Sequence, residues 1–280
     1  MIDLRLRLAA VAFVCCMLTG HYAVPARADG GRVTLQERIA LLQQAYPDLI
    51  YSVTHNIMRL MNNRTVVIDD GRNKDYLTQL HNADIEDQLA QIYPIGKCTL
   101  GRKVAFDPGH IRSAAFLRLA YGANEYQVKR TTTLVDWFGT QVRFSTRHGA
   151  ADALRRVRDD LRQLPAKYHN LLKKPARSMQ WVNIADTDQL DVHAFAIAID
   201  LNPQFRDYWR RFSRGKKLRT IRYRNRIPPA VVAIFERHGF IWGGKWYRYE
   251  TTHFEYRPAL IAIARLAEQR GCVKDMKGKN

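Results

Sequence analysis

The chain has 280 residues, with 45 lysines and arginines against 26 aspartates and glutamates, a formal net charge of +19 at pH 7. This length is enough for one large domain or two small ones. The sequence contains no internal repeat and no low-complexity segment, which excludes a repeat array.

Residues 1–28 have the features of a secretory signal peptide. Arg5 and Arg7 precede an apolar run over 8–18 that is too short to cross a bilayer comfortably, and Pro25–Ala28 ends in the small-x-small pattern that signal peptidase reads. Cleavage near Ala28 removes three basic residues and one acid, which leaves 252 residues with 42 basic against 25 acidic side chains. We therefore expect an exported protein, periplasmic or secreted; an uncleaved anchor is the alternative.

Cys98 and Cys272 are the cysteines that lie outside this leader. In an oxidising compartment two cysteines favour one disulfide bond, here between the middle of the chain and its end. Two buried thiols are the alternative. Neither cysteine is close in sequence to the metal ligands proposed below, so thiolate ligation of zinc is not expected.

Residues 29–125 are predicted to form a mainly helical N-terminal accessory region. His110 stands near the start of a helix there, where a capping or surface role is expected. Pairs of neighbouring acidic residues in this region are better explained by a turn and by the solvated start of a helix than by an acid/base role. The expected elements are helices over 35–42 and 83–93, a short strand over 65–69, and a turn followed by a helix over 106–122.

Residues 126–273 are predicted to form the second domain, and residues 274–280 a polar tail. Helical, strand and hairpin patterns alternate there without a regular βαβ rhythm. We therefore predict an α+β fold, with an antiparallel sheet and flanking helices. The expected elements are a hairpin from 126–137 and 140–146, a strand over 195–201, and helices over 149–164, 227–240 and 258–270.

A strongly basic segment covers residues 206–226, with ten basic residues, one acid and interleaved aromatic rings. Basic and aromatic residues together are typical of nucleic-acid binding. An exported protein meets little nucleic acid, so we expect none as a partner and consider anionic envelope polymers instead. A solvated surface with its aromatic rings in the core is the plainer alternative.

Residues 191–200 and 249–258 contain the groups that carry chemistry. His193, Asp200 and His253 supply two imidazoles and a carboxylate, which suit one Zn²⁺ ion with a position left for water. Glu250 then provides the carboxylate that accepts a proton from this water. Glu255 shares the strand parity of His253 and is expected to orient its ring as an outer partner.

Strand geometry complicates this set, because His193 and Asp200 have opposite parity and would face opposite sides of one strand. His193 is therefore expected in the loop before the strand or at a bulge. Glu250 and His253, three residues apart, would also face opposite sides of one strand. Both can point to one centre if a turn leads into that strand. On spacing alone, a structural role for each histidine and helix capping by Asp200 stay open.

These segments resemble the zinc D-alanyl-D-alanine carboxypeptidase family, which includes vancomycin-resistance dipeptidases and L-alanyl-D-glutamate endolysins. Its pattern is SxHxxGxAxD, followed by an acidic residue, two residues and histidine, and residues 235–258 are similar to its C-terminal block. The resemblance implies His193, Asp200 and His253 as zinc ligands and Glu250 as the catalytic acid/base. It also implies that the turn with Trp242 and Trp246 borders the substrate cleft.

Three positions depart from the family pattern. Asp191 replaces the motif serine, Ala196 replaces the motif glycine, and Val182 stands where related sequences carry a substrate-orienting arginine. Valine supplies neither charge nor a hydrogen bond. Arg177 is near in sequence and is the candidate substitute.

The sequence therefore predicts an exported zinc metallopeptidase that acts on peptidoglycan stem peptides. A zinc-stabilised cell-wall binding protein with weak or no turnover is the runner-up, motivated by the three departures. A basic binder of nucleic acid or membrane surfaces is a third class, whose binding would be sensitive to salt and indifferent to a chelator. The bond that is cut and the oligomeric state are not specified by the sequence.

Overall fold

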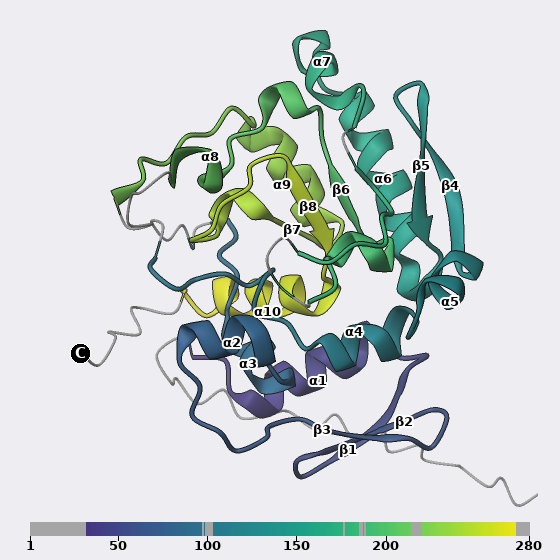
Figure 1. Ribbon diagram of the computed structural model, residues 1–280, viewed down its shortest axis with the longest axis vertical. Coiled ribbons are helices and arrows are strands. Elements are labelled where there is room, and N and C mark those ends of the chain that lie inside the picture. The colour runs from purple at the N-terminus through teal and green to yellow at the C-terminus, as the bar shows by residue number, and fades with distance from the viewer. Residues whose placement is uncertain are drawn as a thin grey trace, which may run out of the picture.

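The computed structural model describes residues 32–96, 98, 103–175, 177–184, 187, 189–213 and 220–272. The predicted signal peptide and polar tail lie outside these residues, as does part of the basic segment (214–219). The architecture is α+β with small antiparallel sheets, as predicted (Figure 1). Within the described residues, no helix combines the length and the apolar character that a membrane crossing requires.

The N-terminal region combines helices with a three-stranded sheet. Thr34 and Glu37 form a capping box that starts the first helix. The sheet has the order β1-β2-β3, of which the sequence indicated the third strand alone. The elements are α1 (Leu35–Ala45), β1 (Ile50–Thr54), β2 (Ile57–Leu60), β3 (Thr65–Val67), α2 (Tyr76–Asn82), α3 (Ile85–Ala90) and α4 (Ala114–Tyr121).

A hairpin follows, in which β4 (Thr132–Trp137) pairs with β5 (Thr140–Ser145). Phe138 and Gly139 connect the strands with φ values of 47° and 86°, as the tightest hairpin turns require. The predicted first strand began too early, because α5 (Glu125–Arg130) occupies its first half. The Asn124 side chain caps this helix by accepting a hydrogen bond from the backbone of Gln127.

The sheet that carries the candidate site has the order β6-β8-β7, with β8 (His253–Tyr256) in the centre. β6 (Ala198–Asp200) and β7 (Phe240–Trp242) both pair with it in antiparallel fashion. Surrounding helices are α6 (Ala150–Arg162), α7 (His169–Leu172), α8 (Trp209–Ser213), α9 (Pro229–Arg237) and α10 (Pro258–Gln269). Short 3-10 turns are η1 (Arg147–Gly149), η2 (Ala166–Tyr168), η3 (Val192–Phe195), η4 (Pro203–Phe205) and η6 (Gly243–Lys245).

One hydrophobic core runs through the described part of the chain, from Val33 in the N-terminal region to Ala267 in α10. α10 contacts β7 on one side and α1 on the other, and it lies between the central sheet and the N-terminal helices (Figure 1). A disulfide bond joins Cys98 to Cys272 just beyond α10. The N-terminal region is therefore packed against the sheet that carries the candidate site.

Candidate metal centre and cleft

His193 lies in η3, immediately before strand β6. The side chain of Asp191 caps this turn and accepts a hydrogen bond from the His193 backbone N–H at 3.0 Å. Ala196 then adopts a left-handed conformation, with φ 55° and ψ 38°. This reversal ends η3 and lets the next residues enter the strand, so the predicted parity conflict between His193 and Asp200 does not arise. It also explains a glycine in the family pattern, since glycine tolerates positive φ.

Asp200 and His253 come from adjacent strands. Asp200 at the end of β6 is paired in register with His253 at the start of β8. Directly opposite residues on neighbouring strands bring their side chains together. The sheet therefore supplies two members of the group, and η3 supplies the third.

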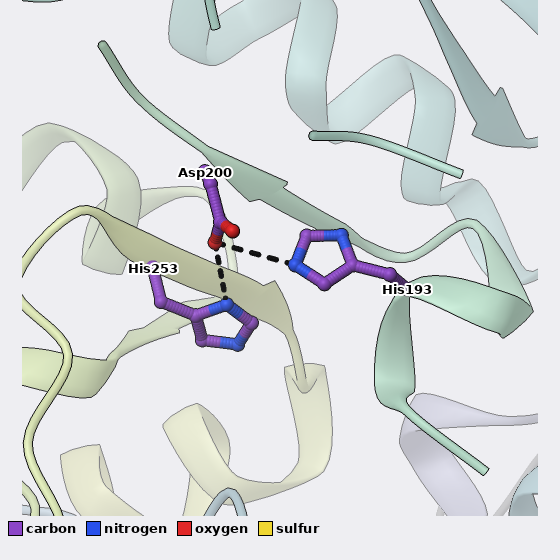
Figure 2. Close-up of side chains that lie close together, drawn as sticks. All are labelled: His193, Asp200 and His253. Atoms are coloured by element: carbon purple, nitrogen blue, oxygen red, sulfur yellow. Dashed lines mark hydrogen bonds and ion pairs between the residues drawn. The ribbon is translucent and has the colours of Figure 1, made fainter. Parts of the chain in front are cut away.

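The three side chains meet at one oxygen of Asp200 (Figure 2). His193 Nε2 lies 3.2 Å and His253 Nδ1 lies 2.8 Å from Asp200 Oδ1. The three residues offer ligand atoms within 4.8 Å of one another, and all three are buried. Figure 2 shows the His193 ring beside the carboxylate and the His253 ring below it, each with one nitrogen toward the same oxygen.

A hydrogen bond behind the His193 ring determines which of its nitrogens faces inward with a lone pair. His193 Nδ1 lies 2.6 Å from the carbonyl oxygen of Ser178, which can only accept, so Nδ1 donates. His253 Nε2 lies 3.5 Å from a Glu255 carboxylate oxygen. A bound metal ion needs both rings neutral; His193 Nε2 then presents its lone pair toward Asp200, and His253 Nδ1 is the nitrogen that faces the same oxygen. Two such nitrogens and a carboxylate fit Zn²⁺ as a three-residue protein ligand set.

The electrostatics of the group are dominated by burial and by opposite charges. Burial would lower the pKa of His253, but the carboxylates of Asp200 and Glu255 outweigh it and raise this pKa to about 10. Burial would raise the pKa of Asp200, yet the two histidines bring it below its usual range. Without a metal ion the group therefore combines an ionised Asp200 with a protonated His253 ring, and a bound cation would displace that proton.

A cleft of about 330 Å³ opens beside this group, and it contains the other predicted residues with one exception. Trp246, Glu250, His253, Glu255 and Arg177 line it. Residues that the sequence did not single out also line it: Arg112, Asn183, Ile184, Val192, Arg206, Tyr208 and Arg210. The cleft borders the candidate ligands, because His253 is part of its lining.

Glu250 stands in the turn before β8, as expected for a residue that shares a centre with His253. Burial, followed by the charge of Asp200, raises the pKa of its carboxyl group. Arg206 Nη2 lies 2.5 Å from Glu250 Oε1, although its direction of approach does not satisfy a hydrogen bond. Glu250 is thus a half-buried carboxylate at the cleft wall, beside the ligand group but outside it.

Arg177 reaches the ligand group from behind. Its Nε donates to Asp200 Oδ2 at 2.8 Å, and its Nη1 lies 3.5 Å from Asp191 Oδ2. Asp200 thus directs one oxygen at the histidines and the other at Arg177. Because Arg177 also lines the cleft, it occupies both the outer shell of the candidate centre and the wall that a substrate would touch.

The two predicted tryptophans have different surroundings. Trp246 lines the cleft, with its ring centroid 5.3 Å from that of His253. Trp242 does not line the cleft: its indole N–H donates to the Thr251 carbonyl at 2.6 Å, and its ring stacks on Phe254. The structure gives Trp242 a packing role, because its position in β7 directs it into the core.

Two residues of the N-terminal region reach this cleft, and the sequence analysis had assigned neither to it. His110, expected to cap a helix or lie at the surface, and Arg112 both line the cleft. The available signal was the short turn around Gly109, which permits close approach of backbone to another segment. A methyl group added at Gly109 would lie 2.1 Å from the Trp246 ring.

A buried group of two histidines and one aspartate, with a further carboxylate in an adjoining cleft, is the arrangement of a zinc-dependent hydrolase. Residues 185–256 match the model of a family described as D-alanyl-D-alanine carboxypeptidase, which confirms the predicted resemblance. No curated protein and no solved structure matches the chain. The family match supports, in general terms, a zinc peptidase that acts on peptidoglycan.

Proposed function

We propose that this protein is an exported zinc metallopeptidase that hydrolyses peptide bonds in peptidoglycan stem peptides. The observation that carries the proposal is the convergence of His193, Asp200 and His253 beside a cleft that contains Glu250. The family match over residues 185–256 supports the peptide substrate. Export rests on the leader pattern over residues 1–28.

The chain supplies both the ligands and the acid/base group. Zn²⁺ held by the three ligands would lower the pKa of a water molecule toward 7 and polarise the scissile carbonyl. Glu250 would take a proton from this water and return it to the leaving amine. Its raised pKa suits both steps, because burial makes the carboxylate a stronger base.

Neighbouring charges hold the ligands in place. Glu255 lies behind the His253 ring, and Arg257 Nη1 lies 3.3 Å from Glu255 Oε1. Arg177 holds the outer oxygen of Asp200. Outer partners of this kind orient metal ligands. Arg177 thereby brings a charged group to the cleft wall, which Val182 does not line.

The proposed reaction is that of a D-Ala-D-Ala carboxypeptidase or that of an L-Ala-D-Glu endopeptidase. Both cut amide bonds beside a D-amino acid, and both suit one zinc ion with one carboxylate acid/base.

A catalytically weak or inactive, zinc-stabilised cell-wall binding protein is the second candidate. The specific observation that favours it is the ion pair between Arg177 and Asp191, the residue that replaces the motif serine. This pair commits the nearest arginine partly to the protein itself. A site with intact ligands and a preoccupied arginine would bind metal and peptide and turn over slowly.

Anionic envelope polymers are proposed as a further partner. A groove of about 790 Å³ lies beside the cleft and is lined mainly by arginines of the basic segment: Arg206, Arg211, Arg222, Arg224 and Arg226. Such a lining attracts polyanions in a salt-dependent manner. Arg206 lines both the groove and the cleft, so the two hollows adjoin.

Purified protein incubated with defined muropeptides tests the function. We expect new product masses, about one zinc ion per chain, and loss of both after treatment with a chelator. Stoichiometric zinc without any product would favour the binding protein. If the protein contains no zinc and yields no product, both candidate functions are ruled out.

A further inference from the structure

The N-terminal region supplies one wall of the candidate active-site cleft. The backbone N–H of Tyr247 donates to the Phe106 carbonyl at 2.7 Å, and that of Arg248 donates to Asp107 Oδ1 at 2.8 Å. The Tyr76 hydroxyl donates to the other oxygen of Asp107. These bonds fasten the turn over residues 106–112, hereafter the wall turn, to the segment that carries Trp246.

Packing between the wall turn and Trp246 leaves no room for a side chain. A methyl group at Gly109 would lie 2.1 Å from the Trp246 ring and 2.8 Å from Glu255 Oε1. The His110 ring meets the Trp246 ring edge to face, with centroids 5.0 Å apart. Contact this close fixes where the indole and the residues after Gly109 lie.

Two buried side chains that carry hydrogen-bond donors line this cleft. Trp246 is 2 % exposed, and its indole N–H has no hydrogen-bond partner among the described residues. Leaving such a donor unpaired in the protein interior is unfavourable, so it favours a ligand that accepts a hydrogen bond. Arg112 is 6 % exposed and donates to the carbonyl oxygens of Gly109 and Leu190, at 2.6 and 3.1 Å. These two bonds use two of its five N–H groups.

The hydrogen-bond partners of Arg112 differ from those of Arg177 and Arg206, which also line the cleft. Arg177 and Arg206 each face a carboxylate of the protein, at 2.8 and 2.5 Å. The hydrogen bonds of Arg112 go to neutral carbonyl groups. Two acids, Glu255 and Asp191, act on Arg112 through their charge. Each already has other cationic partners: Glu255 is in contact with Arg257 and His253, and Asp191 with Arg177. A buried guanidinium held by carbonyl groups retains both charge and donors for an anionic ligand.

We propose that Arg112 and the indole N–H of Trp246 form a carboxylate-binding subsite, built by the wall turn, for a carboxylate group of the peptide substrate. The subsite rests on the proposed peptidase function and specifies its substrate class. The carboxylate comes either from the C-terminus of the peptide or from an acidic side chain. Both sources offer the same two oxygens to the same donors.

Binding to the metal-free full-length protein tests the subsite separately from hydrolysis. Titration calorimetry compares an acylated stem-type peptide with two derivatives, one amidated at its C-terminus and one amidated at its acidic side chain. We expect one of the amidations to weaken binding about tenfold, and that derivative identifies the source of the carboxylate. Equal affinity for all three peptides overturns the subsite.

Two variants assign the effect to the named donors. Trp246→Phe removes the indole N–H and keeps an aromatic ring. Arg112→Lys keeps the positive charge but loses the planar guanidinium with its paired N–H donors. Each should reduce the preference for the free carboxylate to threefold or less. Arg118→Lys, at an exposed position on α4, is the matched control and should keep the full preference. A Trp246→Phe protein that folds and retains the preference refutes the assignment, even if Arg112→Lys fails to fold.

Hydrolysis by the zinc-loaded protein separates this proposal from the proposed function. The subsite predicts that Trp246→Phe raises KM for the free acid about tenfold, with a smaller change in kcat. Peptide binding with the expected preference, but no hydrolysis, would contradict the peptidase and leave the subsite. Hydrolysis of acid and amide with the same KM would contradict the subsite and leave the peptidase.

Discussion

Replacing Glu250 with glutamine should abolish hydrolysis and leave the metal in place. Glutamine keeps the size of the side chain but cannot take a proton from water at neutral pH. A positioned general base contributes about 10²–10⁴ in rate, or roughly 3–5 kcal/mol of activation free energy. The three-residue ligand group does not include Glu250, so zinc content should remain at wild-type level.

The structure also predicts the side effect on stability. Arg206 loses the carboxylate that lies 2.5 Å from its Nη2, but its guanidinium keeps its place over the Tyr208 ring, 4.5 Å from the centroid. The Arg206 side chain is 28 % exposed, and the desolvation cost of the half-buried Glu250 carboxylate disappears at the same time. The change in unfolding free energy should therefore stay within about 1 kcal/mol.

The assay is muropeptide digestion followed by mass spectrometry, combined with metal analysis and thermal unfolding. Glu125→Gln on the exposed surface of α5 is the matched control and should retain activity. If Glu250→Gln keeps more than a tenth of the wild-type rate, Glu250 is not the general base. If the Glu250→Gln protein loses its zinc, Glu250 also contributes to metal binding, and its assignment as an acid/base outside the ligand group is wrong.

Three further predictions concern stability. A chelator should lower the melting temperature and added zinc should restore it, since a ligand at 100 times its Kd stabilises by about 2.7 kcal/mol; an unchanged melting curve would contradict a structural metal. Hydrogen bonds from Arg270 and from Thr34 lower the pKa of Glu37 to about 2. Its unfolded value is 4.5, so this contribution is present above pH 4.5 and is lost as the pH falls toward 2. Glu37→Gln should therefore cost up to about 1 kcal/mol at pH 6 and progressively less in urea titrations at lower pH, whereas a constant difference would rule out this linkage. Cys98 and Cys272 are 174 residues apart in sequence, so reduction of their disulfide bond should destabilise the folded state by up to about 5 kcal/mol on the chain-entropy account. A protein with both Cys98→Ser and Cys272→Ser and an unchanged urea midpoint would contradict this expectation.

Local sequence patterns predicted a large part of the fold. The helices with clear amphipathic spacing and the 132–145 hairpin are present, because capping residues, turn residues and apolar periodicity act over a few positions. Errors occurred where two local preferences competed. The stretch before β4 has the composition of a strand, but the Asn124 cap makes its first half a helix. In β1 and β2, short strands with mixed patterns gave no usable period.

The candidate site was predictable to the extent that its residues stand in recognisable motifs. His193, Asp200 and His253 could be named, and their convergence depends on a feature that spacing does not reveal. That feature is the positive φ of Ala196, which separates η3 from β6. A single residue in the left-handed region changes the direction of a chain, and side-chain parity holds only along one regular strand.

By itself, the sequence determined the α+β class, the chemical identity of the candidate ligands and the acid that accompanies them. Tertiary structure alone decided that His110 and Arg112 of the N-terminal region line the cleft, that Arg206 lies against Glu250, and that Trp242 packs in the core while Trp246 faces the cleft. The physical reason is the separation along the chain over which each kind of signal acts. Motifs and periodicity report on neighbours along the chain, whereas a cleft wall forms between segments more than a hundred residues apart, whose contact depends on how the whole core packs.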